Sequence, residues 1–303
     1  MRLCLYTLPL QQKGFGMLDI LFIVIGVVFL ILLWIMLYDS NRFIVTRYQI
    51  TDKRIRKNCR AVVLADLHNK LYGRDNERLL EAIRECKPDL ILVAGDIPTA
   101  RPGKKLDIAL HLMEELARDY PVYYGNGNHE HRMKLYPETY GDMAERYEEG
   151  LHSIGIDRLV NSHVELSEFG LAVYGAEIDR FYYKRFRVQH MEPAYLKQIL
   201  GQPNGEEYTI LIAHNPDYFS QYAAWGADLV LSGHVHGGMV RIPFVQKGVV
   251  SPNVRFFPKY DGGMYREGET AMLLSRGLGM HTIPIRLFNP GELIVVDLEP
   301  EEV

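Results

Sequence analysis

Two histidines separated by one residue stand in a glycine-rich loop in the second half of the chain. His234 and His236 lie in the segment SGHVHGG (232–238), directly after the apolar run 228–231. An apolar run of strand length that ends in glycine predicts a buried strand opening into a tight loop. Because residues i and i+2 of an extended segment share a face, both imidazoles are expected to point the same way. This placement favours a metal site; a pair of loop histidines without partners is the alternative.

Four other apolar segments of strand length also end in polar residues that can bind metals. They cover residues 60–65, 90–94, 121–124 and 208–213. The polar residues that follow these segments and the 228–231 run are Asp66, His68, Asp96, Asn128, His129, His214, His234 and His236. A set of unrelated loop residues is the alternative, but polar residues of these types at every strand end favour one shared site.

The residue types indicate which metal chemistry such a site would perform. Imidazole, carboxylate and amide oxygen together suit Mn, Fe or Zn, whereas Ca and Mg prefer oxygen ligands alone. No cysteine joins the set, so a structural zinc site is not expected. The set holds more ligands than one metal needs. It therefore predicts two metals about 3.5–4 Å apart that clamp the attacking and leaving oxygens of a phosphoryl displacement. A carboxylate is the expected bridge between them.

The order of the apolar segments predicts how these residues are brought together. Two helical patterns, at 76–83 and 106–117, alternate with the first three strands, and that rhythm is typical of a parallel sheet in an α/β domain. Ligand sites in such sheets lie at the carboxyl ends of the strands. Two facing sheets with helices outside would bury this many apolar strands in one domain. The later strands are expected at 163–166 and 171–174 (an antiparallel hairpin), 208–213, 228–231, 271–275 and 293–297.

Composition sets limits on the class of protein. The 303 residues are 48% hydrophobic and 24% charged, with a net charge of -4. That balance suits one large α/β domain with a deep core, and the mildly acidic charge gives no sign of nucleic-acid binding. The cysteines, Cys4, Cys59 and Cys86, lack the spacing of a metal or redox motif and make no disulfide framework. Cys86 falls in a helical pattern and is expected to be buried.

One uncharged apolar segment near the N-terminus is long enough to cross a bilayer. Residues 20–37 carry no charge, and about 20 such residues span the hydrocarbon core. A secretory signal peptide is the alternative, but its apolar region is only ~7–15 residues long, and no small-residue cleavage site follows here. Trp34 and Tyr38 end the segment as interfacial aromatic residues do. We therefore predict an N-terminal segment at 1–17, a transmembrane anchor at 18–38, a linker at 39–59 and the large domain at 60–303.

Basic residues flank the predicted span unequally. Arg2 and Lys13 precede it, whereas seven lysines and arginines follow it between Arg42 and Arg60. Because loops rich in Lys and Arg stay on the cytoplasmic side, this bias predicts that the large domain faces the cytoplasm. The protein would then be a single-pass protein of the cell membrane.

The order of the polar motifs resembles that of the calcineurin-like metallophosphoesterase superfamily. The motifs are D-x-H at Asp66, G-D at Asp96, G-N-H-E at 127–130, His214, and G-H-x-H at 233–236. The resemblance covers about residues 60–298, and the ordered motifs make it specific. The chain is most similar to membrane-associated bacterial phosphoesterases, a group that includes UDP-2,3-diacylglucosamine pyrophosphatases. Segments 257–263 and 275–279 also resemble that group.

The resemblance implies a fold, cofactors and a role for each residue. It implies a four-layer α/β/β/α sandwich that holds two divalent ions, with Mn favoured over Fe or Zn. The implied ligands of the first metal are Asp66, His68 and His236. Those of the second metal are Asn128, His214 and His234, and Asp96 is the implied bridge between the two metals. His129 would protonate the leaving oxygen or stabilise charge on the phosphoryl group, and Asp66 or Glu130 would orient it.

Together these expectations identify a membrane-anchored, metal-dependent phosphoric ester hydrolase. Its substrate would carry a phosphate ester or a pyrophosphate bond, and a lipid-linked substrate fits the anchor. A non-catalytic metal-binding scaffold on the same fold is the alternative, but such scaffolds typically lose ligands and this chain keeps all of them.

Two basic–aromatic segments, 180–187 and 255–260, are expected to form a lip that docks on anionic lipid. Packing of their rings into the core is the alternative.

Overall fold

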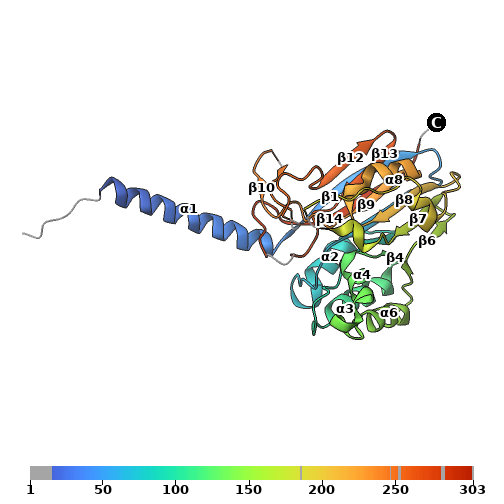
Figure 1. Cartoon of the computed structure of the whole chain (residues 1–303), viewed down its shortest axis with the longest axis horizontal. Helices are drawn as coiled ribbons and strands as arrows, with labels where there is room; N and C mark the ends of the chain where they lie inside the picture. Colours follow the sequence, from blue (N-terminus) through green and yellow to red (C-terminus); the bar gives the residue numbers. More distant parts are fainter. Residues whose placement is uncertain (1–15, 185, 246, 252–253, 281–283, 302–303) are drawn as a thin grey trace, which may run out of the picture.

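Two six-stranded β-sheets face each other in the computed structural model, which describes residues 16–184, 186–245, 247–251, 254–280 and 284–301 (Figure 1). The first sheet has the order β1-β14-β2-β3-β4-β5, and its strands β2 to β5 run parallel. Parallel neighbours need crossover connections, which here are helices. The strands are β1 (Phe43–Asp52), β14 (Gly291–Pro300), β2 (Cys59–Leu64), β3 (Leu90–Ala94), β4 (Val122–Gly125) and β5 (Arg158–Leu159).

The second sheet has a parallel centre and antiparallel edges. Its order is β12-β13-β9-β8-β7-β6, in which β7, β8, β9 and β13 are parallel. The edge strands β6 and β12 each form an antiparallel pair with the next strand in. The strands are β6 (Ser162–Leu166), β7 (Leu171–Ala176), β8 (Tyr208–Ala213), β9 (Leu229–Ser232), β12 (Gly263–Glu267) and β13 (Thr270–Leu274).

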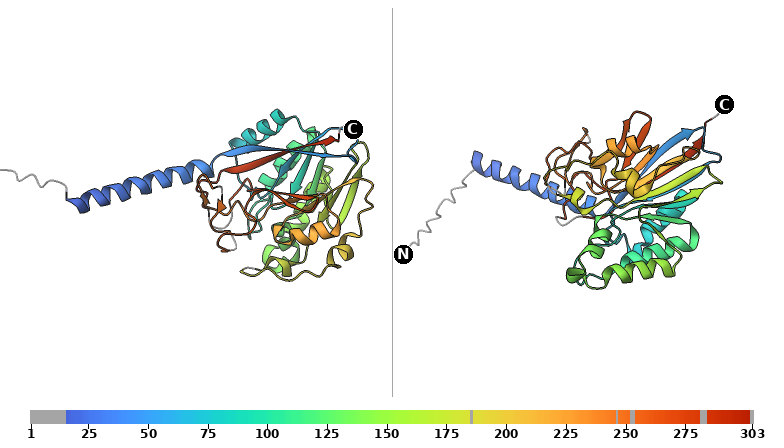
Figure 2. Two further views of the ribbon diagram at one scale, coloured as in Figure 1. Left: turned by 90° about the horizontal axis from the view of Figure 1, so that it is seen from above. Right: turned by 45° about the vertical axis from the view of Figure 1, so that its right-hand side comes forward.

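Helices cover the outer face of each sheet, as both views of Figure 2 show. The first sheet packs against α2 (Glu77–Cys86), α3 (Asp107–Asp119), α4 (Asn128–Leu135) and α6 (Met143–Ser153). The second packs against α7 (Tyr195–Leu200) and α8 (Phe219–Trp225). The predicted four-layer α/β/β/α sandwich is therefore confirmed.

Strand alternation explains how one strand serves two cores. Successive side chains of a strand point to opposite faces. In β2, Val62 packs with the outer helices while Val63 packs between the sheets. In β8, Leu211 packs toward the helices while Ile212 packs between the sheets. Both faces of the central strands are apolar because both are covered.

The N-terminal edge of the first sheet differs from the prediction. Residues 39–59, expected to be a linker, contain the ten-residue strand β1, which pairs in parallel with β14 along its whole length. Ile50 and Ile55 are buried in the core between the sheets. The alternation of apolar and polar residues over 43–50 is weak, and the partner strand lies at the far end of the chain, so sequence reasoning missed this pairing.

The helix α1 (Met17–Ser40) projects away from the sandwich (Figure 1). It is long and apolar enough to cross a membrane, with a mean hydropathy of 3.3 over its most apolar window and none of that window buried. Its last residues contact the domain: Asp39 is buried, pairs with Arg42 and accepts a hydrogen bond from the backbone N–H of Asn289. The predicted span at 18–38 lies inside this helix, and residues 1–15 lie outside the described residues.

The two basic–aromatic segments are partly core and partly surface. Tyr183 and Tyr260 are buried beneath the second sheet, as the packing alternative expected. Phe186, Phe256 and Phe257 are exposed. Arg185 lies outside the described residues, and docking of these segments on lipid stays a prediction.

Candidate metal centre

The carboxyl ends of strands from both sheets converge on one buried cluster. Asp66 and His68 follow β2, Asp96 follows β3, and His214 and His236 follow β8 and β9. Ligand atoms lie within 4.8 Å of one another in three overlapping groups: Asp66, His68 and His236; Asp66, Asp96 and His214; and His68, Asp96 and His129. The predicted convergence of strand ends is therefore found in the structure.

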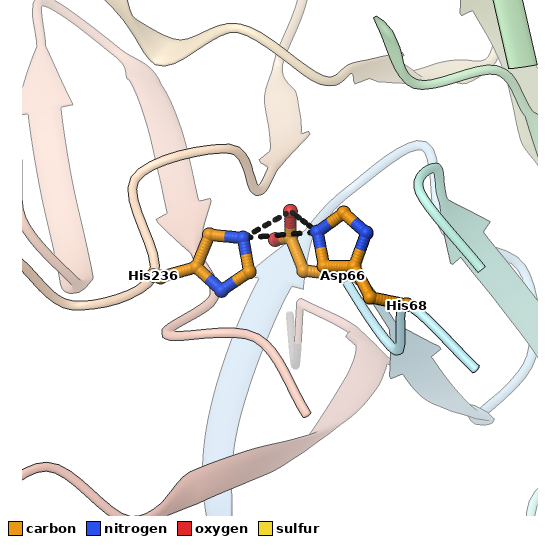
Figure 3. A group of neighbouring side chains, drawn as sticks. All are labelled: Asp66, His68 and His236. Atoms are coloured by element: carbon orange, nitrogen blue, oxygen red, sulfur yellow. Dashed lines mark hydrogen bonds and ion pairs between the residues drawn. The ribbon is translucent and has the colours of Figure 1, made fainter. Parts of the chain in front are cut away.

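The first group combines one carboxylate with two imidazoles (Figure 3). Nε2 of His236 lies 3.2 Å from Oδ1 of Asp66, and Nε2 of His68 lies 3.8 Å from the same oxygen. The two Nε2 atoms are 3.1 Å apart. All three side chains are buried, so their ligand atoms converge away from bulk water.

The second group centres on Asp96. Its Oδ2 lies 3.2 Å from Nε2 of His214 and 3.8 Å from Nε2 of His68. His214 also approaches Oδ1 of Asp66, at 3.6 Å. Asp96 thus lies between the two predicted ligand sets, which is the position that a bridging carboxylate needs.

Asn128 and His234 complete the predicted ligand set less directly. Oδ1 of Asn128 is buried and has no hydrogen-bond partner among the described residues. The His234 ring lies 5.4 Å, centroid to centroid, from the His214 ring and 5.3 Å from the Tyr183 ring. The backbone N–H of His234 donates to both carboxylate oxygens of Asp66.

The donor set fits divalent transition metals. A buried amide oxygen without a partner costs about 1–3 kcal/mol, and a cation would remove that cost at Asn128. Two buried carboxylates beside several imidazoles form the mixed oxygen and nitrogen set that suits Mn, Fe or Zn. The residues present therefore fit the group that the sequence predicts.

Burial and neighbouring charges shift the pKa values in this cluster in opposite directions. Burial raises the pKa of Asp66 and lowers that of His68 well below its usual value. Burial acts against the charged form of Asp96 too, but the imidazoles of His214 and His129 outweigh it and hold the pKa of Asp96 well below its usual value. Burial alone would lower the pKa of His214; the carboxylates of Asp96 and Asp66 raise it to about 10.

A backbone N–H group orients the His129 ring through its Nδ1. Its Nδ1 accepts a hydrogen bond from the N–H of Ala100 at 2.8 Å. The neutral ring must then carry its proton on Nε2, which lies 3.9 Å from Oδ2 of Asp96. The sequence predicted that Asp66 or Glu130 would orient this ring. That prediction is wrong for the hydrogen bond to Nδ1, because the loop after β3 folds back and supplies the donor.

Glu130 has a different task, which is to join two loops. Its carboxylate accepts hydrogen bonds from the backbone N–H groups of Asp96, Ile97 and Gly127, and from the hydroxyl of Tyr124. These bonds tie the end of β3 to the start of α4. Burial and the Asp96 charge raise the pKa of Glu130 to about 7.

The backbone at the cluster is held in a conformation that side chains rarely adopt. Positive φ angles occur at Asp66 (51°), His68 (49°), Asp96 (57°), His234 (73°) and His236 (51°). Such strain persists only where the surrounding structure enforces it, and it is frequent at functional sites. Gly233 permits one of the close approaches, since a Cβ there would lie 2.3 Å from Oδ2 of Asp66.

A cavity of about 640 Å³ borders the cluster on the side of His68 and His129. Its walls also include residues of the loop after β3, Arg132 of α4, Met280 and Pro284. A substrate in this cavity would meet the side chains of His68 and His129. Sequence reasoning named the histidines but did not identify the cavity's other wall residues.

Comparison with known proteins gives one consistent result. The sequence profile described as calcineurin-like phosphoesterase matches residues 59–238. An uncharacterised metallophosphoesterase of Campylobacter jejuni is 27% identical over 255 residues, which cover 81% of this chain and 60% of that protein. An uncharacterised metallophosphoesterase of Bacillus subtilis is 27% identical over 242 residues, which cover 78% of each.

A vertebrate protein adds a membrane-related similarity. A Danio rerio protein named as a transmembrane protein with metallophosphoesterase domain is 27% identical over 250 residues, which cover 79% of this chain and 53% of that protein. This chain thus matches less than two thirds of the length of the Campylobacter and Danio proteins.

Proposed function

This chain belongs to the calcineurin-like phosphoesterase family, and we propose that it is an active metal-dependent phosphoester hydrolase held at a membrane by α1. The observation that carries the proposal is the buried cluster around Asp96, which has carboxylates and imidazoles in contact and a substrate-sized cavity beside it. Both the cluster and the cavity are needed for hydrolysis.

The proposed ligand sets are those that the family resemblance implies, and the clustering of Asp66, His68, Asp96, His214 and His236 supports them. Asp66, His68 and His236 would hold one ion, and Asn128, His214 and His234 would hold the other, with Asp96 shared. Such ions, when bound, supply Lewis-acid stabilisation of charge on phosphoryl oxygens and a more acidic water. The side chains in turn fix the positions of the ions and keep bulk water out.

The protein's own proton donor is His129. Because Nδ1 accepts from Ala100, the neutral ring carries its proton on Nε2, and this N–H would be the donor to a substrate oxygen in the cavity that His129 lines. In the hydrolysis of an ester with a basic leaving group, this donation would neutralise charge on the departing oxygen. Glu130 positions the loop that carries His129 relative to Asp96.

The finer proposal concerns substrate and membrane. Only Asn41 and Arg42 separate α1 from β1, so an inserted α1 would keep the domain against the bilayer surface. That proximity favours a lipid-linked phosphate ester or pyrophosphate, the class that the resemblance to UDP-2,3-diacylglucosamine pyrophosphatases implies. The relatives' names do not address this substrate class. The excess of basic residues after the span favours a cytoplasmic domain.

A panel assay on the full chain in detergent tests the proposal. The protein, stripped of metal and reloaded with Mn, Fe or Zn, would be offered a phosphomonoester, a phosphodiester and a pyrophosphate. We expect hydrolysis of at least one class, and only with metal. Metal binding without hydrolysis of any substrate would instead support the non-catalytic scaffold.

A further inference from the structure

The cavity beside the metal cluster carries an excess of positive charge that the chemistry above does not use. Besides His68 and His129, its wall contains Arg101, Lys104 and Arg132. The remaining wall residues are neutral, and no acidic side chain is among the described residues that line it. A phosphoryl group held at the cluster would therefore have three cations beside it.

Arg132 comes from the same helix as the proposed catalytic residues. The helix α4 begins at Asn128, and residues three and four apart on a helix lie on one face. Arg132 therefore lies one turn beyond Asn128 and His129. It is half-buried, and its Nε is buried without a hydrogen-bond partner among the described residues. Because Arg132 lines the cavity, an anionic ligand there would pair with its guanidinium group.

Arg101 and Lys104 come from the loop that orients His129. Ala100 in this loop donates to His129, and Lys104 N–H donates to the carbonyl of Arg101, which closes a turn. Both basic side chains are exposed, and within the described residues neither forms an ion pair with an acid. Their charges are therefore not neutralised by the protein itself.

We propose that Arg101, Lys104 and Arg132 form a subsite for a second anionic group of the substrate, next to the phosphoryl group that is cleaved. This inference rests on the proposed function and names its substrate class: molecules with a further phosphate or carboxylate close to the scissile phosphate. Arginine presents a planar fork that matches such groups with two parallel hydrogen bonds, and lysine adds a mobile point charge. A substrate with a single phosphate leaves this subsite empty.

Binding of two matched probes tests the subsite without needing turnover. The probes are n-propylphosphonate and propane-1,3-diylbisphosphonate, which share a carbon chain, differ by one phosphonate group and contain no ester bond that the protein could hydrolyse. Calorimetry on the metal-loaded full chain in detergent measures both affinities, at two salt concentrations. We expect the bisphosphonate to bind roughly 10-fold to 100-fold more tightly, the range that hydrogen bonds to charged groups provide, with a preference that weakens at high salt.

Single substitutions assign the preference to these residues. Lys104→Met and Arg132→Met should each reduce the bisphosphonate preference severalfold and leave the affinity for n-propylphosphonate nearly unchanged. Arg132→Lys should restore part of the preference, since it keeps the charge and loses the fork. Lys105→Met and Lys134→Met are matched controls, because they remove a charge from the same loop and the same helix outside the cavity wall.

The outcomes separate this inference from the proposed function. Equal affinity for the two probes in the unmodified protein, or a preference that Lys104→Met and Arg132→Met leave intact, overturns the subsite. A preference that Lys105→Met and Lys134→Met reduce equally also overturns it, because the effect is then one of overall charge. Failure of every ester to be hydrolysed would contradict the proposed function alone, since the binding measurement still decides the subsite.

Discussion

Asp96 lies where the loops of both sheets meet. Its Oδ2 is within 3.9 Å of imidazole nitrogens of His68, His129 and His214, and its Oδ1 accepts the backbone N–H of His129. We propose this carboxylate as the ligand that two ions share. Its removal should then affect both proposed ions, whereas removal of another ligand should affect mainly one.

Asp96→Asn keeps the shape of the side chain and removes its charge. We expect less than one equivalent of bound metal and a fall in hydrolysis of at least ~10²-fold, because metal ions supply several kcal/mol to this chemistry. Elemental analysis and turnover check this. Asp157→Asn, at an exposed aspartate far from the cluster, is the control. Full metal content with unchanged turnover in Asp96→Asn would rule out the bridging role.

His129→Gln should keep the metals and lose rate. Proton donation and charge stabilisation by such a group contribute about 10²–10⁴-fold. The loss should be largest for alkyl esters and smaller for p-nitrophenyl esters, whose leaving group departs without a proton. Rates on this ester pair, with metal content measured in parallel, provide the check, and His111→Gln on α3 is the control. Equal losses on both esters would argue against proton donation.

At the scale of single residues, the sequence predicted the clustered side chains but not the contacts that position them. Asp66, His68, His214 and His236 could be found because each follows an apolar strand, and strand ends of a sandwich converge. The Ala100 contact to His129 could not be found, since it depends on how the loop after β3 folds back. Arg132 is not part of a recognisable sequence motif, and its place in the cavity wall follows only from the direction of α4.

The elements hold the cluster through their ends rather than their centres. Parallel strands in both sheets deliver the ligands, and the loops after β2, β3 and β9 adopt positive φ angles that the surrounding packing enforces. Glu130 joins the loop after β3 to the loop after β4 with three backbone hydrogen bonds. Rigid scaffolding of this kind is what a site with several ligands needs.

The strand β1 gives a test at the scale of elements. A chain beginning at Asp39 keeps β1, and a chain beginning at Arg60 removes it. The second should unfold at a lower temperature or aggregate, because it exposes the edge of β14 and the core around Ile50 and Ile55, worth about 1.5–3 kcal/mol for each buried isoleucine. Thermal unfolding of both chains provides the comparison. Equal stability would mean that β1 is dispensable.

The central strands of both sheets could be predicted from the sequence, whereas the edge strand β1 could not. The apolar runs at 90–94 and 208–213 match β3 and β8 residue for residue, because strands covered on both faces show continuous apolar sequence. β1 is exposed on part of its surface and pairs with a strand nearly 250 residues away, so its sequence carries a weaker signal. Long-range pairing of this kind is visible only in the folded chain.

At the scale of the whole molecule, a rigid sandwich follows directly after an apolar helix. Asp39, at the end of α1, is tied to Asn289, and Lys70 donates to the side chain of Asn41. The domain is therefore joined to α1 by packed contacts rather than by a flexible connection. If α1 spans a bilayer, the orientation of the domain relative to the membrane is restricted.

Protease treatment of membrane vesicles tests the predicted topology. In sealed vesicles with the cytoplasmic face inside, the domain should resist added protease and become sensitive after detergent. In inverted vesicles it should be cleaved without detergent. The physical reason is the excess of basic residues between Arg42 and Arg60, which favours the cytoplasmic side. The opposite pattern of sensitivity would place the domain outside the cytoplasm.

Titration of metal into the metal-free protein is the most direct test of the claim that this chain is a metal-dependent phosphoester hydrolase. Turnover of a good ester substrate would be followed as Mn, Fe or Zn is added, with bound metal measured at each point. We predict no turnover without metal and a rise that reaches its plateau at two equivalents per chain. Full turnover of the metal-free protein, or two bound equivalents with no turnover of any ester, would contradict the account.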